Sequence, residues 1–265
     1  MRITVKLGGS ILENAAVRAG ILSDVAGASA RGHEVLLVHG GGKSLNRRLS
    51  QLGIESHFVE GLRVTDAETL AAAVMVLAGE VNKKIVSEIN HSGACALGLC
   101  GADACAVRCA RLSDMPGSPP GIGFVGKPSE VSRSFFDRAF AAGWIPVVSS
   151  IALGPDGSLY NVNADQMASA CASGAGCTSL VYLTDVAGVL DARGTVLGRL
   201  CESDIDNLRA QGVLKGGMLP KTSSCLEALR GGVGDVFILP GSTPGILTNF
   251  IEGKRTEGTH IHGTR

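Results

Sequence analysis

Strand patterns and helical patterns alternate along the whole of this 265-residue chain, and the alternation constrains the fold more than any other feature. We expect strands at 3–7, 34–38, 94–99, 104–109, 145–149, 179–184 and 235–239, with a last one from Gly258. We expect helices at 13–30, 43–52, 67–90, 132–142, 203–211 and 217–230, with another that begins at Asn163. This order is typical of a mainly parallel sheet covered by helices on both faces. The sequence therefore predicts an α/β fold in one domain over residues 1–265, with a candidate lobe boundary near Ile151.

The composition limits the classes of partner and site. Lys and Arg number 24, as do Asp and Glu, so the chain lacks the basic excess that a nucleic-acid surface needs. No apolar run reaches the length of a membrane span, and Gly8 comes too early for a signal peptide. The eight cysteines include no C-x-x-C pair, so we expect buried, reduced thiols and no metal site of the protein's own. We therefore expect a cytoplasmic protein that binds neither nucleic acid nor a membrane.

Two expected strands end in glycine-rich turns that lead into helices. The first turn reads K-L-G-G-S at 6–10, and the second reads H-G-G-G at 39–42. Glycine lets the backbone approach a ligand closely, and the free N–H groups of a helix N-terminus favour an anion. In a parallel sheet both turns lie at the carboxyl ends of strands, where ligands bind. Together with Lys6, they predict an anion-binding site.

A third glycine-rich segment resembles phosphate-binding motifs but has the wrong context. The sequence G-I-G-F-V-G at 121–126 matches G-x-G-x-x-G, yet it follows two prolines and precedes Lys127-Pro128. It therefore neither follows a strand nor opens a helix, as the dinucleotide-binding motif requires. Pro128 also stands where a P-loop has its hydroxyl residue. We predict a loop or hairpin over 115–128.

Other polar side chains lie near expected helix starts. Arg63 precedes a helix capped at Thr65-Asp66, and a guanidinium suits bidentate capture of a carboxylate, although a lone arginine is usually a surface residue. Asn161 and Asn163 alternate ahead of Asp165, and Asn163 is equally well explained as a helix cap.

Two further segments suit a nucleotide. Lys215 and Lys221 flank a glycine turn and a helix start, and a lysine acts as a point charge for phosphate. The segment 184–190 begins at the end of an expected strand and could shape a nucleotide pocket.

Six motifs in chain order resemble the amino-acid-kinase family, and its acetylglutamate branch in particular: K-L-G-G-S, V-H-G-G-G, G-L-R-V-T-D, N-V-N-A-D, T-D-V-A-G-V-L-D and G-G-M-L-P-K. The likeness covers essentially the whole chain, and the third motif combined with the fourth is the most specific. The resemblance implies a three-layer αβα sandwich and an ATP-dependent kinase that phosphorylates the γ-carboxylate of N-acetyl-L-glutamate in arginine biosynthesis. It implies that Mg²⁺ arrives with ATP, held mainly by the nucleotide. It also implies that residues 1–150 bind the amino acid and form a dimer interface, and that residues 151–265 bind the nucleotide.

The resemblance also implies a role for each matching position. Lys6 and Lys221 resemble the two lysines that neutralise the transferring phosphoryl group, and Asp165 resembles the residue that holds both in place. The positions implied at the amino-acid substrate are Gly41, Gly42, Arg63 (for the α-carboxylate), Asn161 and Asn163. The positions implied at the nucleotide are Gly8, Gly9, Asp185, Val186, Ala187, Gly188, Val189, Leu190, Val213, Leu214, Lys215 and Gly217.

Some features depart from the family's pattern. Lys43 follows the glycine triplet, where many relatives have proline or an apolar residue. The tail at 259–265 runs past the usual ending, and we expect it to be frayed. Lys6 lies so near the start that no extra helix fits before the first strand, whereas arginine-inhibited relatives carry one there. We therefore expect a homodimer that arginine does not strongly inhibit.

Three alternatives stay open. The same chemistry could act on another acyl amino acid, such as a carrier-linked or N-acetylated aminoadipate or N-succinylglutamate, because one methylene is worth only about 1–3 kcal/mol in a pocket. A non-catalytic binding or regulatory protein could keep the fold, although it would not need a lysine pair at a phosphoryl site. A dinucleotide-binding oxidoreductase is the third, and the failed glycine motif weakens it.

Overall fold

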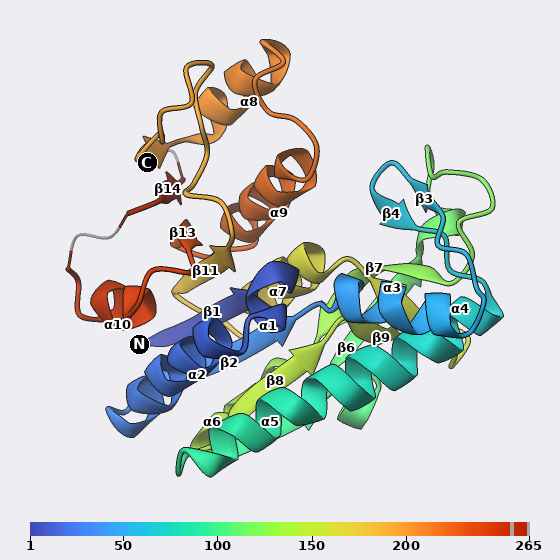
Figure 1. Cartoon of the computed structure of the whole chain (residues 1–265), viewed down its shortest axis with the longest axis horizontal. Helices are drawn as coiled ribbons and strands as arrows, with labels where there is room; N and C mark the ends of the chain where they lie inside the picture. The colour runs from blue at the N-terminus through green and yellow to red at the C-terminus, as the bar shows by residue number, and fades with distance from the viewer. Residues whose placement is uncertain (255–256, 264–265) are drawn as a thin grey trace.

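The computed structural model describes residues 1–254 and 257–263 and is built around an eight-stranded sheet (Figure 1). The strands are β1 (Arg2–Leu7), β2 (Glu34–His39), β5 (Ala96–Leu99), β8 (Ile145–Ser149), β11 (Ser179–Thr184), β12 (Arg199–Leu200), β13 (Asp235–Pro240) and β14 (Thr259–His262). Their order is β12-β14-β13-β11-β1-β2-β8-β5, and every neighbouring pair is parallel except β13 and β14. The mainly parallel sheet is confirmed. The pairing of β1 with β11 joins the strands from the first part of the chain, which are β1, β2, β5 and β8, to the strands from the later part.

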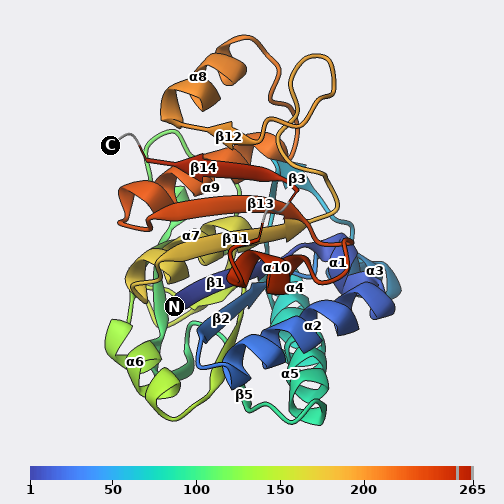
Figure 2. The same ribbon diagram turned by 90° about the vertical axis from the view of Figure 1, so that its left-hand side faces the viewer.

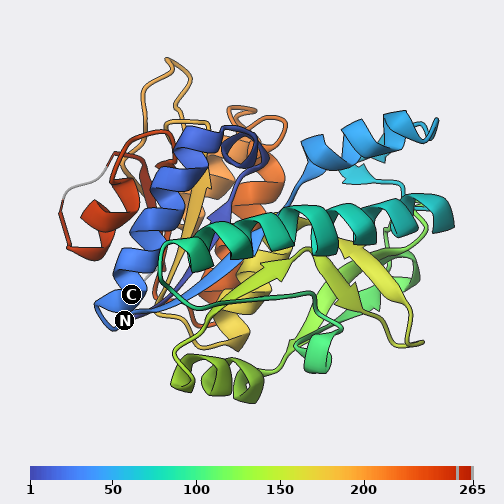
Figure 3. The same ribbon diagram turned by 60° about the horizontal axis from the view of Figure 1, so that its bottom comes forward.

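Helices cover both faces of the sheet (Figure 2 and Figure 3). One face packs against α1 (Gly9–Glu13), α2 (Ala15–Ala30), α3 (Gly42–Gln51), α10 (Ile246–Ile251) and the continuous run of α4 (Ala67–Ala73), the π-helical segment η1 (Val74–Val81) and α5 (Asn82–His91). The other face packs against α6 (Arg133–Ala141), α7 (Ala164–Gly174), α8 (Glu202–Ala210) and α9 (Met218–Arg230). Successive strand residues point to opposite faces, so Val35 and Leu37 of β2 join the first core and Leu36 and Val38 the second. The chain is therefore an αβα sandwich.

A second, smaller sheet lies beside the first and was not expected. Four short strands form a closed barrel: β6 (Val107–Arg111), β7 (Val125–Val131), β9 (Ile151–Leu153) and β10 (Leu159–Val162). The expected loop over 115–128 is wrong at its end, because β7 begins at Val125. Gly126 and Pro128 hide this strand in the sequence, and a register shift in β6 accompanies the proline. As expected, the glycines before β7 open no helix.

Two further expectations need correction. The single helix expected over 13–30 is two helices, because the Asn14 side chain accepts a hydrogen bond from Val17 N and caps α2. The strand expected over 104–109 begins only at Val107, because Ala104 and Cys105 have φ of 50° and 53° in a short 3-10 turn, η2 (Asp103–Cys105). A second such turn, η3 (Leu112–Asp114), follows β6.

The last strand, expected from Gly258, is confirmed, because Thr259–His262 form β14, which pairs with both β12 and β13. The further expectation of a frayed tail is therefore wrong for these residues. The His260 ring stacks on Phe237, and its Nε2 lies 2.6 Å from Asp235 Oδ1. Residues 264–265 of the tail lie outside the described part of the chain.

All eight cysteines are free thiols, but only half of them are buried. Cys109, Cys171, Cys177 and Cys225 pack in the core as expected, whereas Cys95 and Cys105 are exposed and Cys100 and Cys201 are half-buried. Within the described ranges, no helix is both long and apolar enough to cross a membrane.

Gly41 generates a test of the fold. Its φ is 154°, and a Cβ there would lie 2.8 Å from Leu77 Cδ2, whereas a Cβ on Gly42 would meet nothing within 4 Å. We expect Gly41→Ala to lower the free energy of unfolding by about 1–3 kcal/mol in urea titrations. Gly42→Ala, the matched control, should leave it within about 0.5 kcal/mol. Equal effects of the two substitutions would contradict this account of the turn.

Candidate functional site

A cleft of about 720 Å³ lies where β1, β2 and β11 end. The turns after β1 and β2, the hairpin of β3 (Phe58–Val59) and β4 (Leu62–Arg63), and the first turns of α7 and α9 contribute to its walls. Most of the residues singled out in the sequence meet here: Lys6, Gly8, Gly9, Gly41, Gly42, Arg63, Asn161, Asn163, Asp165, Asp185, Val186, Lys215, Gly217 and Lys221.

Asp165 lies between two lysines at the floor of this cleft. Lys6 Nζ, at the end of β1, is 2.6 Å from Asp165 Oδ1. Lys221 Nζ, in the first turn of α9, donates to Asp165 Oδ2 at 2.9 Å. The three side chains are only 10%, 12% and 12% exposed, so the ion pairs are held largely out of water.

The three charges set one another's ionisation. Burial alone would raise the pKa of the Asp165 carboxyl, but the charges of Lys6 and Lys221 outweigh burial and hold that pKa at about 2. Burial lowers the pKa of the Lys6 ammonium, and the charge of Asp165 opposes that shift. The Asp165 carboxylate is therefore ionised at neutral pH, with a lysine side chain bound to each of its oxygens. Two lysines around one carboxylate favour an anion in the cleft.

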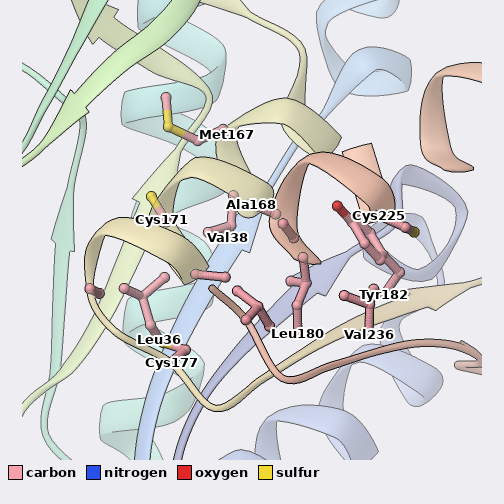
Figure 4. Packing of buried hydrophobic residues seen from close by; sticks show 14 of the residues in the cluster. Leu36, Val38, Met167, Ala168, Cys171, Cys177, Leu180, Tyr182, Cys225 and Val236 are labelled. Carbon is pink, nitrogen blue, oxygen red and sulfur yellow. The ribbon is translucent and has the colours of Figure 1, made fainter. Parts of the chain in front are cut away.

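Two residues fix the position of Asp165 on its helix. Asn163 Oδ1 accepts hydrogen bonds from Asp165 N at 2.8 Å and Gln166 N at 3.2 Å, so Asn163 caps α7. The buried Tyr182 hydroxyl donates to the Asp165 backbone oxygen at 3.1 Å, and Lys221 Nζ lies 5.1 Å from the centre of the Tyr182 ring. Figure 4 shows Tyr182 beneath the helices, among the apolar side chains of this core. Sequence reasoning missed Tyr182 because it reads as an ordinary core residue of β11.

The turn after β2 is held by a buried polar pair that the sequence reading also missed. His39 Nδ1 lies 2.8 Å from Gly40 O and therefore carries the proton of that hydrogen bond. His39 Nε2 accepts from Asn82 Nδ2 at 3.0 Å, and the same amide donates to Val147 O at 2.8 Å. Both side chains are fully buried. The pair links the glycine turn to α5 and β8, and only the histidine beside the glycines could have signalled it.

Arg63 lies at another wall of the cleft without a carboxylate partner among the described residues. The residue is only 8% exposed, and its guanidinium donates to Ser56 Oγ at 2.8 Å and to Asn46 Oδ1 at 2.5 Å. The guanidinium also lies 4.6 Å from the centre of the Phe58 ring. Burial lowers its pKa, yet an arginine stays charged at neutral pH. A buried, unneutralised guanidinium suits an anionic ligand.

Asn161 is anchored close to this arginine. Its Nδ2 donates to Thr65 Oγ1 at 3.2 Å, and that hydroxyl donates to Arg63 O at 2.9 Å. Thr65 is fully buried, and its backbone oxygen accepts a hydrogen bond from Phe124 N at 2.6 Å. These bonds connect β10, β4 and the start of β7, so the Arg63 and Asn161 side chains share one rigid frame.

The structure does not bring every predicted residue to the cleft walls. The positions left out are Ala187, Gly188, Val189, Leu190, Val213 and Leu214. Val189 and Leu214 are buried in the apolar core. Gly188 packs against β14, where an added Cβ would lie 2.7 Å from Thr259 Oγ1. The cleft also includes Lys43, Asn46, Phe58 and Ser150, which the sequence reading assigned to no site.

His39 makes stability depend on pH. Burial lowers its pKa from 6.5 to about 4, so the unfolded chain binds a proton between those values and the folded chain does not. Stability therefore falls as pH drops through this window, by at most about 3 kcal/mol. In urea titrations across the window, His39→Gln should flatten the dependence, and the exposed-site control His91→Gln should not. An unchanged slope in His39→Gln would show that another group is responsible.

Comparisons with known proteins agree with this geometry. Residues 1–240 match the amino acid kinase family. The chain is 44% identical over 266 residues to the acetylglutamate kinase of Koribacter versatilis, covering 100% of both chains. It is 44% identical over 261 residues to that of Acidobacterium capsulatum, covering 98% of this chain and 99% of the other. A solved N-acetylglutamate synthase from Neisseria gonorrhoeae, complexed with coenzyme A and N-acetyl-glutamate, shares the fold with a TM-score of 0.86 at 23% identity, over 100% of this chain and 60% of that one. The expected family is confirmed: the chain belongs to the amino acid kinase family.

Proposed function

We propose that this chain transfers the γ-phosphoryl group of ATP to the γ-carboxylate of N-acetyl-L-glutamate, a step of arginine biosynthesis. The observation that carries the proposal is one cleft with two kinds of cation. One is the buried Lys6–Asp165–Lys221 cluster, and the other is the buried Arg63, which pairs with no carboxylate of the described residues. A phosphoryl donor needs the lysine cluster, and the second carboxylate of a dicarboxylate needs the arginine. The 44% identity to acetylglutamate kinases over the full chain supports the same substrates.

The chemistry needs cations more than it needs a base. An oxygen of the γ-carboxylate attacks the γ-phosphorus, the bond to the bridging oxygen breaks, and ADP leaves with that oxygen. The attacking carboxylate is already ionised at neutral pH, so no general base is required. Two anions must nevertheless approach one another, and charge stabilisation dominates phosphoryl transfer. Lys6 and Lys221 supply positive charge at the transferring group, and Asp165 keeps them together.

The amino-acid side of the site follows from Arg63 and Asn161. Arg63 would bind the α-carboxylate, and its contacts to Ser56 and Asn46 would hold the guanidinium in one orientation. Asn161 and Asn163 line the cleft between Arg63 and Asp165, and Gly41 and Gly42 would offer backbone N–H groups.

The nucleotide side draws on the later part of the chain. Asp185, Val186, Lys215 and Gly217 line the cleft there, which supports a nucleotide half in the later part of the chain. Gly8 and Gly9, which the proposal also places at the nucleotide, come instead from the turn after β1. A hydrogen bond from Ser10 lowers the pKa of the Asp185 carboxyl, so an ionised oxygen fits a Mg²⁺ ion held mainly by phosphate oxygens. When bound, that ion neutralises charge on the phosphate chain. The homodimer and the cytoplasmic location stay predictions.

A substrate panel tests the proposal. ADP release with MgATP would be compared for N-acetyl-L-glutamate, glutamate, N-succinylglutamate and N-acetyl-aminoadipate. We expect clear preference for N-acetyl-L-glutamate. Turnover only with another acyl amino acid would keep the kinase mechanism and contradict the substrate, whereas no turnover with any of them would favour a binding protein or a carrier-linked substrate.

Lys6→Met tests the phosphoryl side. The variant loses one buried cation that would stabilise charge in the transition state. We expect kcat to fall by about 100-fold or more, with the circular dichroism spectrum unchanged. Lys127→Met is the control, because Lys127 pairs with Glu227 outside the cleft. Turnover by Lys6→Met at the rate of the control would rule out a catalytic role for Lys6.

Arg63→Met tests the amino-acid side. We expect KM for N-acetyl-L-glutamate to rise by about 10- to 100-fold, because a charge-assisted hydrogen bond is lost, while KM for MgATP stays unchanged. Acetamidobutanoate, which lacks the α-carboxylate, provides the matched control. Its slow turnover should be equally slow in the wild type and in Arg63→Met. A further loss with acetamidobutanoate would mean that Arg63 contacts something other than the α-carboxylate.

A further inference from the structure

The first turn of α3 contains a lysine that the helix itself does not explain. Lys43 is the second residue of α3, and its side chain is exposed. The positive end of the helix dipole lies at this end, so a cation there lowers helix stability. No acidic residue in the first turn compensates it, and within the described ranges Lys43 forms no ion pair with a carboxylate. Neither the helix nor a direct ion pair within the described residues therefore explains a lysine at this position.

The position of Lys43 places its charge over the phosphoryl end of the cleft. Lys43 lines the cleft directly after Gly41 and Gly42, and Ser10 lines it from the turn into α1. The helices α1 and α3 lie next to each other at this end of the sheet (Figure 2). Asp185, directly after β11 and on the side that the proposed nucleotide would occupy, lines the same cleft. Lys43 therefore shares this cleft with residues of the proposed nucleotide side.

Lys221 is another lysine at a helix start, and a carboxylate of the protein neutralises its charge. It also lies in the first turn of a helix without an acidic residue in that turn, but it donates to Asp165. Lys43 has the same kind of position and lines the same cleft, but it pairs with no carboxylate in the part of the chain that the structure describes. Its charge is therefore available to a ligand, and a lysine on its flexible stem acts as a mobile point charge for phosphate.

We propose that Lys43 contacts the phosphate chain of the bound nucleotide, as a third lysine beside Lys6 and Lys221. The inference rests on the proposed kinase function and adds a nucleotide-contacting residue to it. The cation disfavoured by the α3 dipole in the free protein is neutralised when the polyphosphate enters. Lys43 thus lowers the stability of α3 in the free protein, and only the phosphate charge of the bound nucleotide offsets this loss.

Binding measurements on Lys43→Met test this contact. Titration calorimetry with the Mg²⁺ complex of adenylyl imidodiphosphate should show about 10-fold weaker binding, because one charge-assisted contact is lost. KM for N-acetyl-L-glutamate should stay within about twofold of the wild-type value. Lys43→Arg should recover part of the nucleotide affinity. Lys84→Met, which removes the same charge from an exposed position outside this cleft, should change neither quantity.

The unfolding midpoint separates a ligand contact from a structural role. Lys43→Met removes a cation from the positive end of α3, so its urea midpoint should be equal to or above that of the wild type. Unchanged nucleotide affinity, or weaker binding of N-acetyl-L-glutamate alone, would overturn the proposal, and so would a lowered midpoint with normal nucleotide affinity. If the wild type phosphorylates no acyl amino acid, the proposed function fails, while nucleotide binding still decides the role of Lys43.

Discussion

Asp165 accepts ion pairs from two lysines that would otherwise repel one another, and the chemistry of the cleft depends on this arrangement. Lys6 and Lys221 come from opposite ends of the chain, and a buried carboxylate with a pKa of about 2 keeps both ammonium groups at one point. An ion pair buried in this way is weak evidence for stability, because the cost of removing the charges from water is comparable to their attraction. Its value lies in the preorganised positive field, since the cations need not move when an anion arrives.

The topology explains how residues so distant in sequence meet. Parallel strands bring their carboxyl ends to one edge of the sheet, so the turns after β1 and β2 and the end of β11 face the same cleft. The helix α7 begins at that edge, where Asn163 caps it and Tyr182 binds its first turn from below. Asn161 comes from β10 of the barrel. Its hydrogen bond to Thr65 supports the hairpin of β3 and β4, which carries Arg63. Each charged group therefore stands on an element whose position is fixed by packing or hydrogen bonds remote from the ligand.

Much of this could be predicted from the sequence, and the failures have physical reasons. Strands buried on both faces read as continuous apolar runs, so β1, β2, β8, β11 and β13 were placed almost to the residue. Of the barrel strands, β9 and β10 are only three and four residues long and β7 contains Gly126 and Pro128, so these three give no such signal. Lys6, Arg63, Asp165 and Lys221 could be named because charge beside a glycine turn or a helix start is conspicuous. Tyr182 and the His39–Asn82 pair act through hydrogen bonds formed on folding, which no local pattern encodes. Backbone conformation misled the prediction at Asn14 and at Ala104, where a cap and a left-handed turn interrupt good periodic patterns.

The central claim is that Asp165 organises two cations for phosphoryl transfer, and the turnover of Asp165→Asn with MgATP and N-acetyl-L-glutamate tests it most directly. The amide keeps the shape of the side chain but removes the charge that holds Lys6 and Lys221 together. The account predicts that kcat falls by about 100-fold or more in a protein that still shows the wild-type circular dichroism spectrum. A folded Asp165→Asn variant with the turnover of the wild type would contradict it.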